Sequence, residues 1–314
     1  MLRVAFVFPG QGSQSVGMGQ AWAERYPIAR RAFAEADETL GFSLSELCWN
    51  GPEEELQLTA NTQPALLATS VAILRVVRDL GVEPVMVAGH SLGEYSALVA
   101  ARCLEYPEAL QLVRRRGEAM QEAVPVGQGS MAAILGLESG DVLTAVSQAA
   151  GDEVCTVANY NAPDQTVIAG HTPAVHRAVE LCKEQGARRA VLLPVSAPFH
   201  SSLMMPARES LTPFLERTTF SDPLVTVVCN VDAQPVATGA EARDALKRQI
   251  DGPVRWVESV EWMAGAGEVE LFVEVGPGKV LTGLNRRIEP QIKTVSLSEP
   301  ESLAKLQERL GETV

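Results

Sequence analysis

Closely spaced cysteines are missing from this sequence of 314 residues. Zinc sites and redox-active dithiols need such spacing, so the sequence indicates no metal, no redox centre and no bound cofactor. The cysteines are also odd in number and widely scattered, which argues against a disulfide framework. We expect reduced, packed thiols at Cys48, Cys103, Cys155, Cys182 and Cys229.

Positive charge is scarce as well. Lys and Arg number 26 against 39 Asp and Glu, which gives a formal net charge of −13 at pH 7 and a pI near 4.9. A nucleic-acid binder needs a basic stripe that neutralises phosphates, and the sequence has none. The composition therefore excludes a general nucleic-acid binder, and an acidic protein partner would have to approach a local patch of Lys and Arg.

Long hydrophobic runs are absent too. A membrane-spanning helix needs about 20 consecutive apolar residues, whereas even the uncharged segment Leu56–Leu74 is interrupted by Gln57, Asn61 and Pro64. The first apolar run, Leu2–Phe8, has the pattern of a strand, and no basic leader precedes it. From these features we expect a globular protein without membrane contact and with a cytoplasmic location.

What is present is an alternation of short apolar runs with helical patterns. Buried strands of a mainly parallel sheet are expected at Leu2–Phe8, Val85–Ala88, Val191–Val195, Val225–Val228 and Leu271–Val275. Helices are expected at Gly17–Arg25, Ile28–Leu40, Gln63–Leu80, Glu94–Ala101, Pro107–Ala123 and Val257–Ala264. This alternation predicts an α/β fold with an α/β-hydrolase-like core.

The middle of the chain follows a different pattern, with the order β-α-β-β-α-β. Its elements are expected at Ser130–Leu137, Gly140–Ala150, Val154–Asn159, Gln165–Ala169, Pro173–Gln185 and Arg189–Pro194. That order is typical of a ferredoxin-like unit. We therefore predict a ferredoxin-like domain at 127–196, inserted into a large catalytic domain made of 1–126 and 197–314.

A G-x-S-x-G motif, Gly89-His90-Ser91-Leu92-Gly93, lies between an apolar strand and a helical pattern. In that context the motif forms a sharp turn that lifts a nucleophilic serine clear of the sheet. The Leu92 N–H would sit at a helix N-terminus, where it can face a developing oxyanion. Ser91 is thus the candidate nucleophile, and the alternative is a glycine-rich turn without catalytic function.

Serine needs a base, and the sequence holds four histidines. His90 shares the turn of Ser91, so its ring should point away, while His171 is expected in a turn and His176 on a solvated helix. His200 lies where the inserted domain returns to the large one, and active sites favour domain junctions. His200 is therefore the candidate base, although an ordinary loop histidine is an equal alternative at this point.

Two further segments carry candidate binding groups. The turn Phe8–Gln14 is rich in glycine but lacks the Gly-Lys-Ser/Thr ending of a phosphate loop. The Gln11 N–H would complete an oxyanion hole there, and the alternative is a helix-entry turn. The run Arg114–Arg116 cannot share one helix face. Most charge runs are solvated, but one arginine turned inward would read a substrate carboxylate.

These separated motifs together resemble those of the malonyl-CoA:acyl carrier protein transacylase family of fatty-acid synthesis, which also supplies the acyltransferase domains of polyketide synthases. The resemblance covers almost the whole chain. It rests on the segments 8–14, Asn61-Thr62-Gln63-Pro64-Ala65, Gly89-His90-Ser91-Leu92-Gly93-Glu94-Tyr95, Arg116-Gly117, Pro198-Phe199-His200-Ser201 and Glu274-Val275-Gly276-Pro277-Gly278.

The resemblance implies a role for each candidate. Ser91 would carry the acyl group, His200 would be its base, and Arg116 would bind the malonyl carboxylate. Backbone N–H groups of Gln11 and Leu92 would bind the oxyanion. Members of this family orient the base with a main-chain carbonyl or amide group, and Gln249 matches that position.

The same resemblance implies malonyl-CoA as donor and acyl carrier protein as partner, in a ping-pong cycle through a malonyl-Ser91 ester. Leu92 and the Phe199-His200 pair match the malonyl-type members. We expect a monomer, and a basic docking patch for the acidic carrier at Arg188, Arg189, Arg286 and Arg287. The alternatives are a polyketide acyltransferase, a serine thioesterase or other hydrolase, and a carrier-binding scaffold without turnover.

Overall fold

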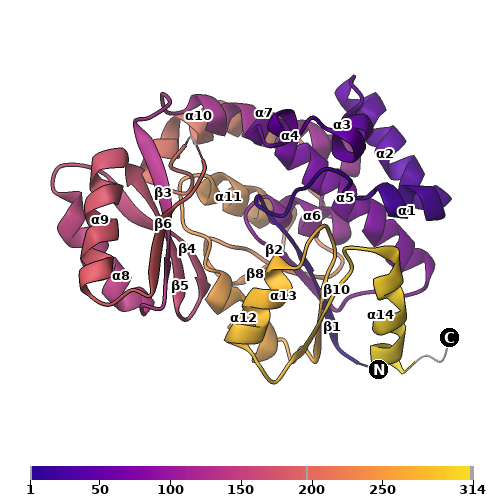
Figure 1. Cartoon of the computed structure of the whole chain (residues 1–314). Coiled ribbons are helices and arrows are strands. Elements are labelled where there is room, and N and C mark those ends of the chain that lie inside the picture. The colour runs from indigo at the N-terminus through magenta and orange to yellow at the C-terminus, as the bar shows by residue number, and fades with distance from the viewer. Residues whose placement is uncertain (1, 196, 312–314) are drawn as a thin grey trace.

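The computed structural model describes residues 2–195 and 197–311 (Figure 1). Met1, Ser196 and the last three residues of the predicted large domain lie outside this description. Two sheets organise the chain, one of six strands and one of four. Within the described ranges, no helix has the length and apolar character that crossing a membrane requires.

The six-stranded sheet is mainly parallel. Its order is β10-β9-β1-β2-β7-β8, and only the β7–β8 pair is antiparallel. The strands are β1 (Val4–Phe8), β2 (Met86–Gly89), β7 (Thr226–Val228), β8 (Pro235–Val236), β9 (Leu271–Glu274) and β10 (Lys293–Ser296). Every residue of β1, β2 and β9 is buried, as expected for parallel strands covered on both faces.

Helices cover both faces of this sheet. Phe6 and Phe8 of β1 point into the larger core, whereas Ala5 and Val7 point into a second core beneath α12 (Trp256–Ala264) and α13 (Val280–Ile288). The larger core is formed with α1 (Gln20–Arg25), α2 (Pro27–Leu40), α3 (Leu44–Asn50), α5 (Thr59–Asp79), α6 (Gly93–Ala100), α7 (Tyr106–Glu122), α10 (Met205–Arg217), α11 (Gly239–Gln249) and α14 (Leu303–Leu310). The short α4 (Glu53–Leu56) precedes α5. The predicted α/β class is confirmed.

The helix α5 begins four residues before the predicted start at Gln63. Pro64 favours a helix start, yet here it lies inside the helix and cannot donate to the carbonyl of Ala60. The Arg114 Nη1 group donates to that carbonyl at 3.0 Å. Tertiary contact therefore supplies the hydrogen bond that proline removes, which the local sequence does not reveal.

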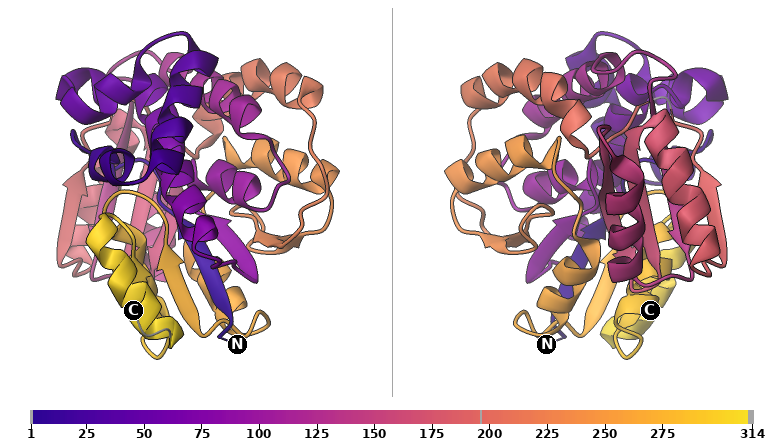
Figure 2. Two further views of the ribbon diagram at one scale, coloured as in Figure 1. Left: turned by 90° about the vertical axis from the view of Figure 1, so that its right-hand side faces the viewer. Right: turned by 90° about the vertical axis from the view of Figure 1, so that its left-hand side faces the viewer.

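The four-stranded sheet is antiparallel and has the order β4-β5-β3-β6. Its elements are β3 (Gly129–Leu135), α8 (Ser139–Ala150), β4 (Cys155–Ala162), β5 (Gln165–His171), α9 (Thr172–Glu184) and β6 (Arg189–Leu192). Figure 2 shows both helices on the outer face of this sheet, where they form a core of their own. The β-α-β-β-α-β order and this strand order match a ferredoxin-like unit.

One predicted strand belongs elsewhere. The run Val191–Val195 was predicted as a strand of the parallel sheet and also, within Arg189–Pro194, as the last strand of the ferredoxin-like unit. Arg189–Leu192 pairs with β3 in the antiparallel sheet, so the second prediction is confirmed and the first is wrong. β6 is an edge strand, with Val191 37% and Leu192 42% exposed. An apolar run on an edge strand resembles a buried parallel strand in sequence, which explains the error.

The glycines of the turn Gly89–Gly93 allow backbone segments to approach one another very closely, and this leads to a stability prediction. A Cβ on Gly93 would lie 2.1 Å from the Phe8 carbonyl oxygen, a backbone atom that cannot move aside. Gly93→Ala should therefore lower the free energy of unfolding by about 3 kcal/mol.

Gly140→Ala is the control, since a Cβ there meets nothing within 4 Å. It should stabilise the protein by about 0.5 to 1 kcal/mol. Urea unfolding with equal midpoints for both variants would contradict this.

Candidate active site

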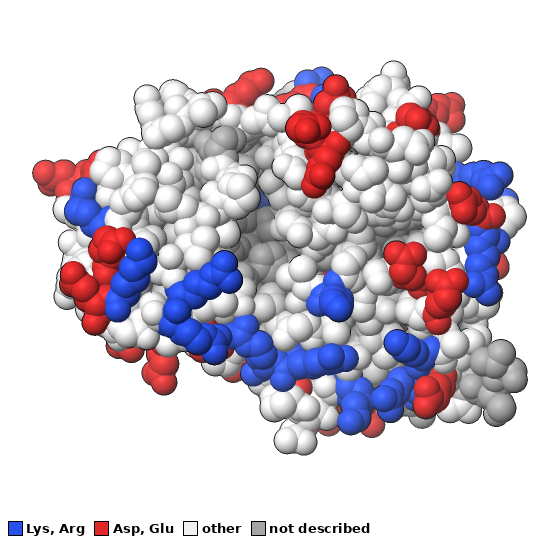
Figure 3. Space-filling view, viewed as in Figure 1, with Lys and Arg blue, Asp and Glu red and all other residues white. Residues whose placement is uncertain are grey.

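The candidate site lies where the carboxyl ends of three parallel strands meet the small sheet. Ser91 follows β2, Gln11 follows β1 and Asn230 follows β7. In open parallel sheets, ligands bind outside these strand ends. A cavity of about 180 Å³ opens there, with Met131 and Val167 of the small sheet on its other side. The corresponding face of the molecule is hollowed between its two lobes (Figure 3).

Ser91 stands on a strained turn. Its φ is 52°, in the left-handed region that non-glycine residues rarely adopt. The Asn230 side chain bridges this turn: its Oδ1 accepts from the Ser91 N–H at 2.7 Å, and its Nδ2 donates to the Gly89 carbonyl at 2.7 Å. These two bonds hold the serine in the conformation that presents its hydroxyl to the cavity.

His200 lies against the serine hydroxyl. Its Nε2 is 2.7 Å from Ser91 Oγ, and its Nδ1 is 2.9 Å and 3.1 Å from the carbonyl oxygens of Gln249 and Gly252. Both partners of Nδ1 are acceptors, so Nδ1 carries the proton and Nε2 accepts one from the serine. Burial, followed by the charge of Arg116, lowers the pKa of His200 to about 3. The imidazole is therefore neutral and free to act as a base.

A pH profile follows from this pKa. With the pKa near 3, His200 stays neutral from pH 7.5 down to 5.5, so the rate of serine acylation should change less than threefold over that range. A histidine with the ordinary pKa near 6.5 would lose about tenfold by pH 5.5. Single-turnover acylation at saturating acetyl-CoA is the suitable measurement, because this donor brings no carboxylate to Arg116. A tenfold decline would contradict the neutral, buried base.

Arg116 is the one member of the arginine run that faces the site. Its side chain is buried, with hydrogen bonds from Nη1 to Gln63 Oε1 at 2.9 Å, and from Nη2 to Ser91 Oγ at 3.1 Å and Gln249 Oε1 at 3.0 Å. A guanidinium has five N–H donors, so two remain, and Nε is without a partner in the described part of the chain. The guanidinium thus keeps donor capacity, and its positive charge beside the nucleophile suits a substrate carboxylate.

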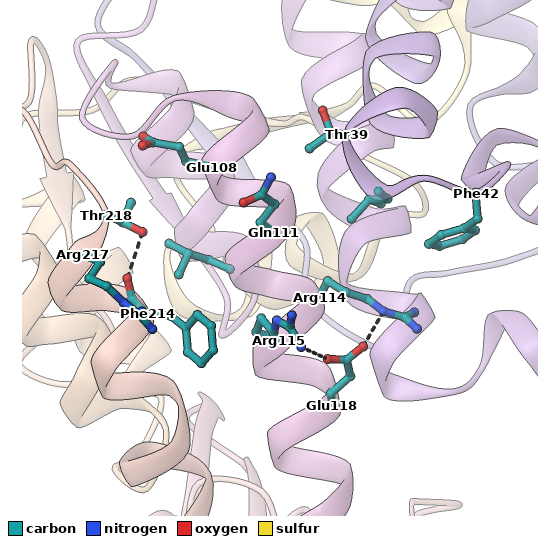
Figure 4. A pocket seen from close by; sticks show the side chains of 12 residues that line it. Thr39, Phe42, Glu108, Gln111, Arg114, Arg115, Glu118, Phe214, Arg217 and Thr218 are labelled. Carbon is teal, nitrogen blue, oxygen red and sulfur yellow. Dashed lines mark hydrogen bonds and ion pairs between the residues drawn. The ribbon is translucent and has the colours of Figure 1, made fainter.

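The other two arginines face away from the site. Arg114 and Arg115 both pair with Glu118, at 2.8 Å and 3.4 Å. They line a hollow of about 760 Å³ between α2, α7 and α10, which Figure 4 shows together with Phe42 and Phe214. This hollow is larger than the cavity at Ser91. It lacks a nucleophile with an adjacent base, so it is not the catalytic centre.

The two residues proposed as oxyanion donors lie in neighbouring turns. The turns after β1 and β2 are joined by a hydrogen bond from the His90 N–H to the Phe8 carbonyl at 3.0 Å. Gly10 allows this approach, since a Cβ there would lie 2.4 Å from the His90 carbonyl oxygen. Gln11 and Leu92 both line the cavity at Ser91, and Leu92 is the N-cap residue of α6. The structure thus brings both residues to the cavity of the candidate nucleophile.

Gln249 contacts several residues of the site at once. Its carbonyl oxygen holds His200, and its side-chain Oε1 accepts from Arg116. Its Nε2 donates to the Ser91 carbonyl at 3.0 Å and to Glu94 Oε2 at 2.8 Å. The end of α11 therefore orients the base and the cation together.

The remaining histidines lie outside this chemistry. His90 lines the cavity at Ser91, but its Nε2 is 2.7 Å from Asn161 Oδ1 and its ring packs against Trp256. The His171 Nδ1 accepts from the Val154 N–H at 2.9 Å, and His176 is exposed on α9. Among the described residues, no cluster of three or more His, Cys, Asp or Glu is arranged to hold a metal ion.

Sequence reasoning missed several residues of the site. Asn230, Gly252 and Glu94 were given no role, and Gln63 was quoted only within a motif. Asn230 is separated by 139 residues from the serine that it holds. A lone asparagine in a turn carries no local signal, so only the folded chain reveals this contact.

Comparisons with known proteins identify the family of this chain. The family model described as acyl transferase domain matches residues 5–301. The malonyl CoA-acyl carrier protein transacylase of Escherichia coli (strain K12) is 52% identical over 97% of this chain and 98% of its own. The crystal structure of an acyl carrier protein S-malonyltransferase from Vibrio cholerae is 50% identical, with a TM-score of 0.94 over 97% of this chain and 99% of its own.

A third match is a complex. A malonyl-transacylase solved together with a type II polyketide-synthase acyl-carrier protein is 45% identical, with a TM-score of 0.95 over 98% of this chain and 99% of its own. Each of these matches covers nearly the full length of this chain and of the matched protein, so the similarity extends over the whole fold. This chain belongs to the acyl transferase family, among the malonyl CoA-acyl carrier protein transacylases.

Proposed function

We propose that this enzyme transfers the malonyl group of malonyl-CoA to the phosphopantetheine thiol of acyl carrier protein, by a ping-pong cycle through a malonyl-Ser91 ester. One observation carries the proposal: His200 Nε2 lies 2.7 Å and Arg116 Nη2 lies 3.1 Å from the same serine oxygen. A base and a carboxylate-binding cation thus meet at one nucleophile. The names of the relatives and the carrier complex of a homologue support the choice of donor and acceptor.

The first half-reaction acylates the serine. Ser91 Oγ attacks the thioester carbonyl while His200 Nε2 takes its proton. The oxyanion that forms is met by the backbone N–H groups of Leu92 and Gln11, each of which lowers the barrier by about 3 kcal/mol. When the intermediate collapses, the coenzyme A sulfur leaves with the proton from His200, and the malonyl ester remains on Ser91.

The second half-reaction repeats these steps with a different thiol. The phosphopantetheine thiol gives its proton to His200 and attacks the ester, and the proton then returns to Ser91 as the malonyl-carrier thioester leaves. Positioned proton transfer contributes about a hundredfold to ten-thousandfold to each step. Neither step recognises the acyl group, so selectivity must come from Arg116.

The direct test follows malonyl groups from labelled malonyl-CoA in the presence of carrier protein bearing phosphopantetheine. A transacylase forms malonyl-carrier with little free malonate, whereas a thioesterase or hydrolase releases malonate at the same rate without carrier. A carrier-binding scaffold does neither. Carrier protein without phosphopantetheine is the control, because it offers the same surface but no thiol. Malonate release without malonyl-carrier formation would overturn the proposal.

Docking of the acidic carrier should depend on basic side chains near the entrance to the Ser91 cavity, on the face that is hollowed between the two lobes. Figure 3 shows a band of Lys and Arg below the hollow on this face. The four candidates are exposed. Two are the first residue of β6 and the residue before it, and two lie at the end of α13, where Arg287 also pairs with Asp164 in the turn between β4 and β5. They are Arg188, Arg189, Arg286 and Arg287.

Charge reversal to Glu at all four positions should raise the carrier KM about tenfold and weaken its salt dependence. The KM for malonyl-CoA in acylation without carrier should stay unchanged. Reversal of Lys305 and Arg309, exposed on α14, is the control and should have no effect on the carrier KM. An unaltered carrier KM and salt dependence in the fourfold variant would remove these residues from the docking surface.

A further inference from the structure

Glu94 is a buried carboxylate that the proposed mechanism does not use. It lies on the first turn of α6, directly after the turn Gly89–Gly93, and is 1% exposed. Its Oε2 accepts two hydrogen bonds of 2.8 Å, one from the Asn230 N–H and one from Gln249 Nε2. A buried charge is costly unless it is compensated, so the position of its counter-charge matters.

That counter-charge is Arg116, which is linked to Glu94 through the side chain of Gln249. The three hydrogen bonds of the guanidinium all go to uncharged oxygens, and one of these is Gln249 Oε1 at 3.0 Å. The same amide donates through Nε2 to Glu94. Flipping the amide would place its NH₂ against the cation and its oxygen against the carboxylate. The Gln249 amide therefore connects Glu94 to Arg116 in a single orientation.

We propose that Glu94 is a second determinant of acyl-group selectivity, because its charge, relayed to Arg116 through Gln249, competes with the substrate carboxylate for the guanidinium. The inference rests on the proposed function of Arg116 as the malonyl-binding group. When Glu94 is ionised, the cation is already partly neutralised and binds malonyl less strongly. When Glu94 is neutral, the full positive charge acts on the substrate.

The ionisation of Glu94 falls in an accessible range. Burial raises the pKa of Glu94 to about 7, while its hydrogen bonds and the charge of Arg116 oppose the rise. The carboxyl is thus neutral below this pH and charged above it. Selectivity for malonyl should accordingly decrease as the pH rises from 6 to 8.

Other groups around Glu94 keep their charge over this range. Asp232, in the turn after β7, is held below its usual pKa by Arg248 and stays ionised. Burial raises the pKa of Cys229 to about 12 and also raises that of Tyr95, so both stay protonated. Among the charged and titratable neighbours of Glu94, the change between pH 6 and 8 is therefore assigned to Glu94 itself.

The experiment measures the ratio of kcat/KM for malonyl-CoA to kcat/KM for acetyl-CoA from pH 6 to 8. The two donors share coenzyme A and the Ser91–His200 chemistry, so those contributions cancel in the ratio. In the wild type the ratio should fall several-fold and by at most about tenfold, because the neutral fraction of Glu94 falls from about 0.9 at pH 6 to about 0.1 at pH 8. Glu94→Gln keeps an acceptor oxygen for Gln249 and removes the charge, so its ratio should be flat and at least equal to the wild-type value at pH 6. Glu118→Gln, on the outer face of α7, is the control and should follow the wild type.

A wild-type profile in Glu94→Gln, or a lower ratio than wild type at every pH, would overturn the inference. The wild-type series is decisive without any variant, since a flat ratio contradicts the proposal even if Glu94→Gln fails to fold. Failure of the proposed function is distinguishable: in that case Arg116→Ala would leave the wild-type preference for malonyl unchanged. If Arg116→Ala removes the preference and Glu94→Gln does not alter it, only the role of Glu94 is refuted.

Discussion

Replacing His200 by alanine should slow acylation of Ser91 by malonyl-CoA about a hundredfold to ten-thousandfold. The expected loss follows from the 2.7 Å contact between His200 Nε2 and Ser91 Oγ. His200 Nε2 is the only proton acceptor proposed for the serine. Without it, the hydroxyl must ionise at its ordinary, very high pKa. Rapid mixing of enzyme with malonyl-CoA, followed by quenching and intact-mass analysis, gives the rate directly.

His176→Ala is the matched control for this substitution. His176 is exposed on α9, so its removal should leave the acylation rate within twofold of wild type. Thermal unfolding of both variants separates a chemical defect from a folding defect. Acylation of a folded His200→Ala enzyme at the wild-type rate would refute His200 as the base.

Replacing Arg116 by alanine should abolish most of the preference for malonyl-CoA over acetyl-CoA. A buried arginine–carboxylate pair contributes about 2 to 5 kcal/mol, because the lone partner is left without a counter-charge. The ratio of kcat/KM for the two donors should therefore fall by at least tenfold. The change is expected mainly from poorer use of malonyl-CoA, because an acetyl group offers nothing to the guanidinium.

Arg115→Ala supplies the comparison within the same helix. Arg115 is exposed and pairs with Glu118, so its loss should leave the donor ratio unchanged. Parallel kinetics with both donors on the two variants and the wild type check this prediction. Equal donor ratios for Arg116→Ala and wild type would show that selectivity resides in other residues.

Local signals explain which parts of the site were predictable. The Gly89–Gly93 turn is contiguous, and its glycines are required by contacts within a few residues, such as the 1.9 Å that would separate a Gly89 Cβ from the Gly93 carbonyl oxygen. The ferredoxin-like unit was predictable for the same reason, since each of its elements shows its own periodicity. Helix geometry predicted only that the three arginines could not share one face, and the resemblance was needed to single out Arg116.

Long-range contacts explain what the sequence left open. The helix α11 was not predicted, because its sequence is largely polar and only its buried residues such as Ala245 and Leu246 face the core. It nevertheless delivers Gln249 to the base and to the cation. Choosing His200 over other histidines likewise required either the resemblance or the fold, since Ser91 and His200 are 109 residues apart.

Peptide mapping of the acyl adduct tests the central claim most directly. The enzyme is mixed with malonyl-CoA, quenched, digested and analysed by mass spectrometry, with and without prior exposure to carrier protein bearing phosphopantetheine. The account predicts a malonyl-sized adduct on the peptide containing Ser91, absent in Ser91→Ala, that this carrier discharges and carrier without phosphopantetheine does not. An active enzyme without this adduct, or with the adduct on another residue, would contradict it.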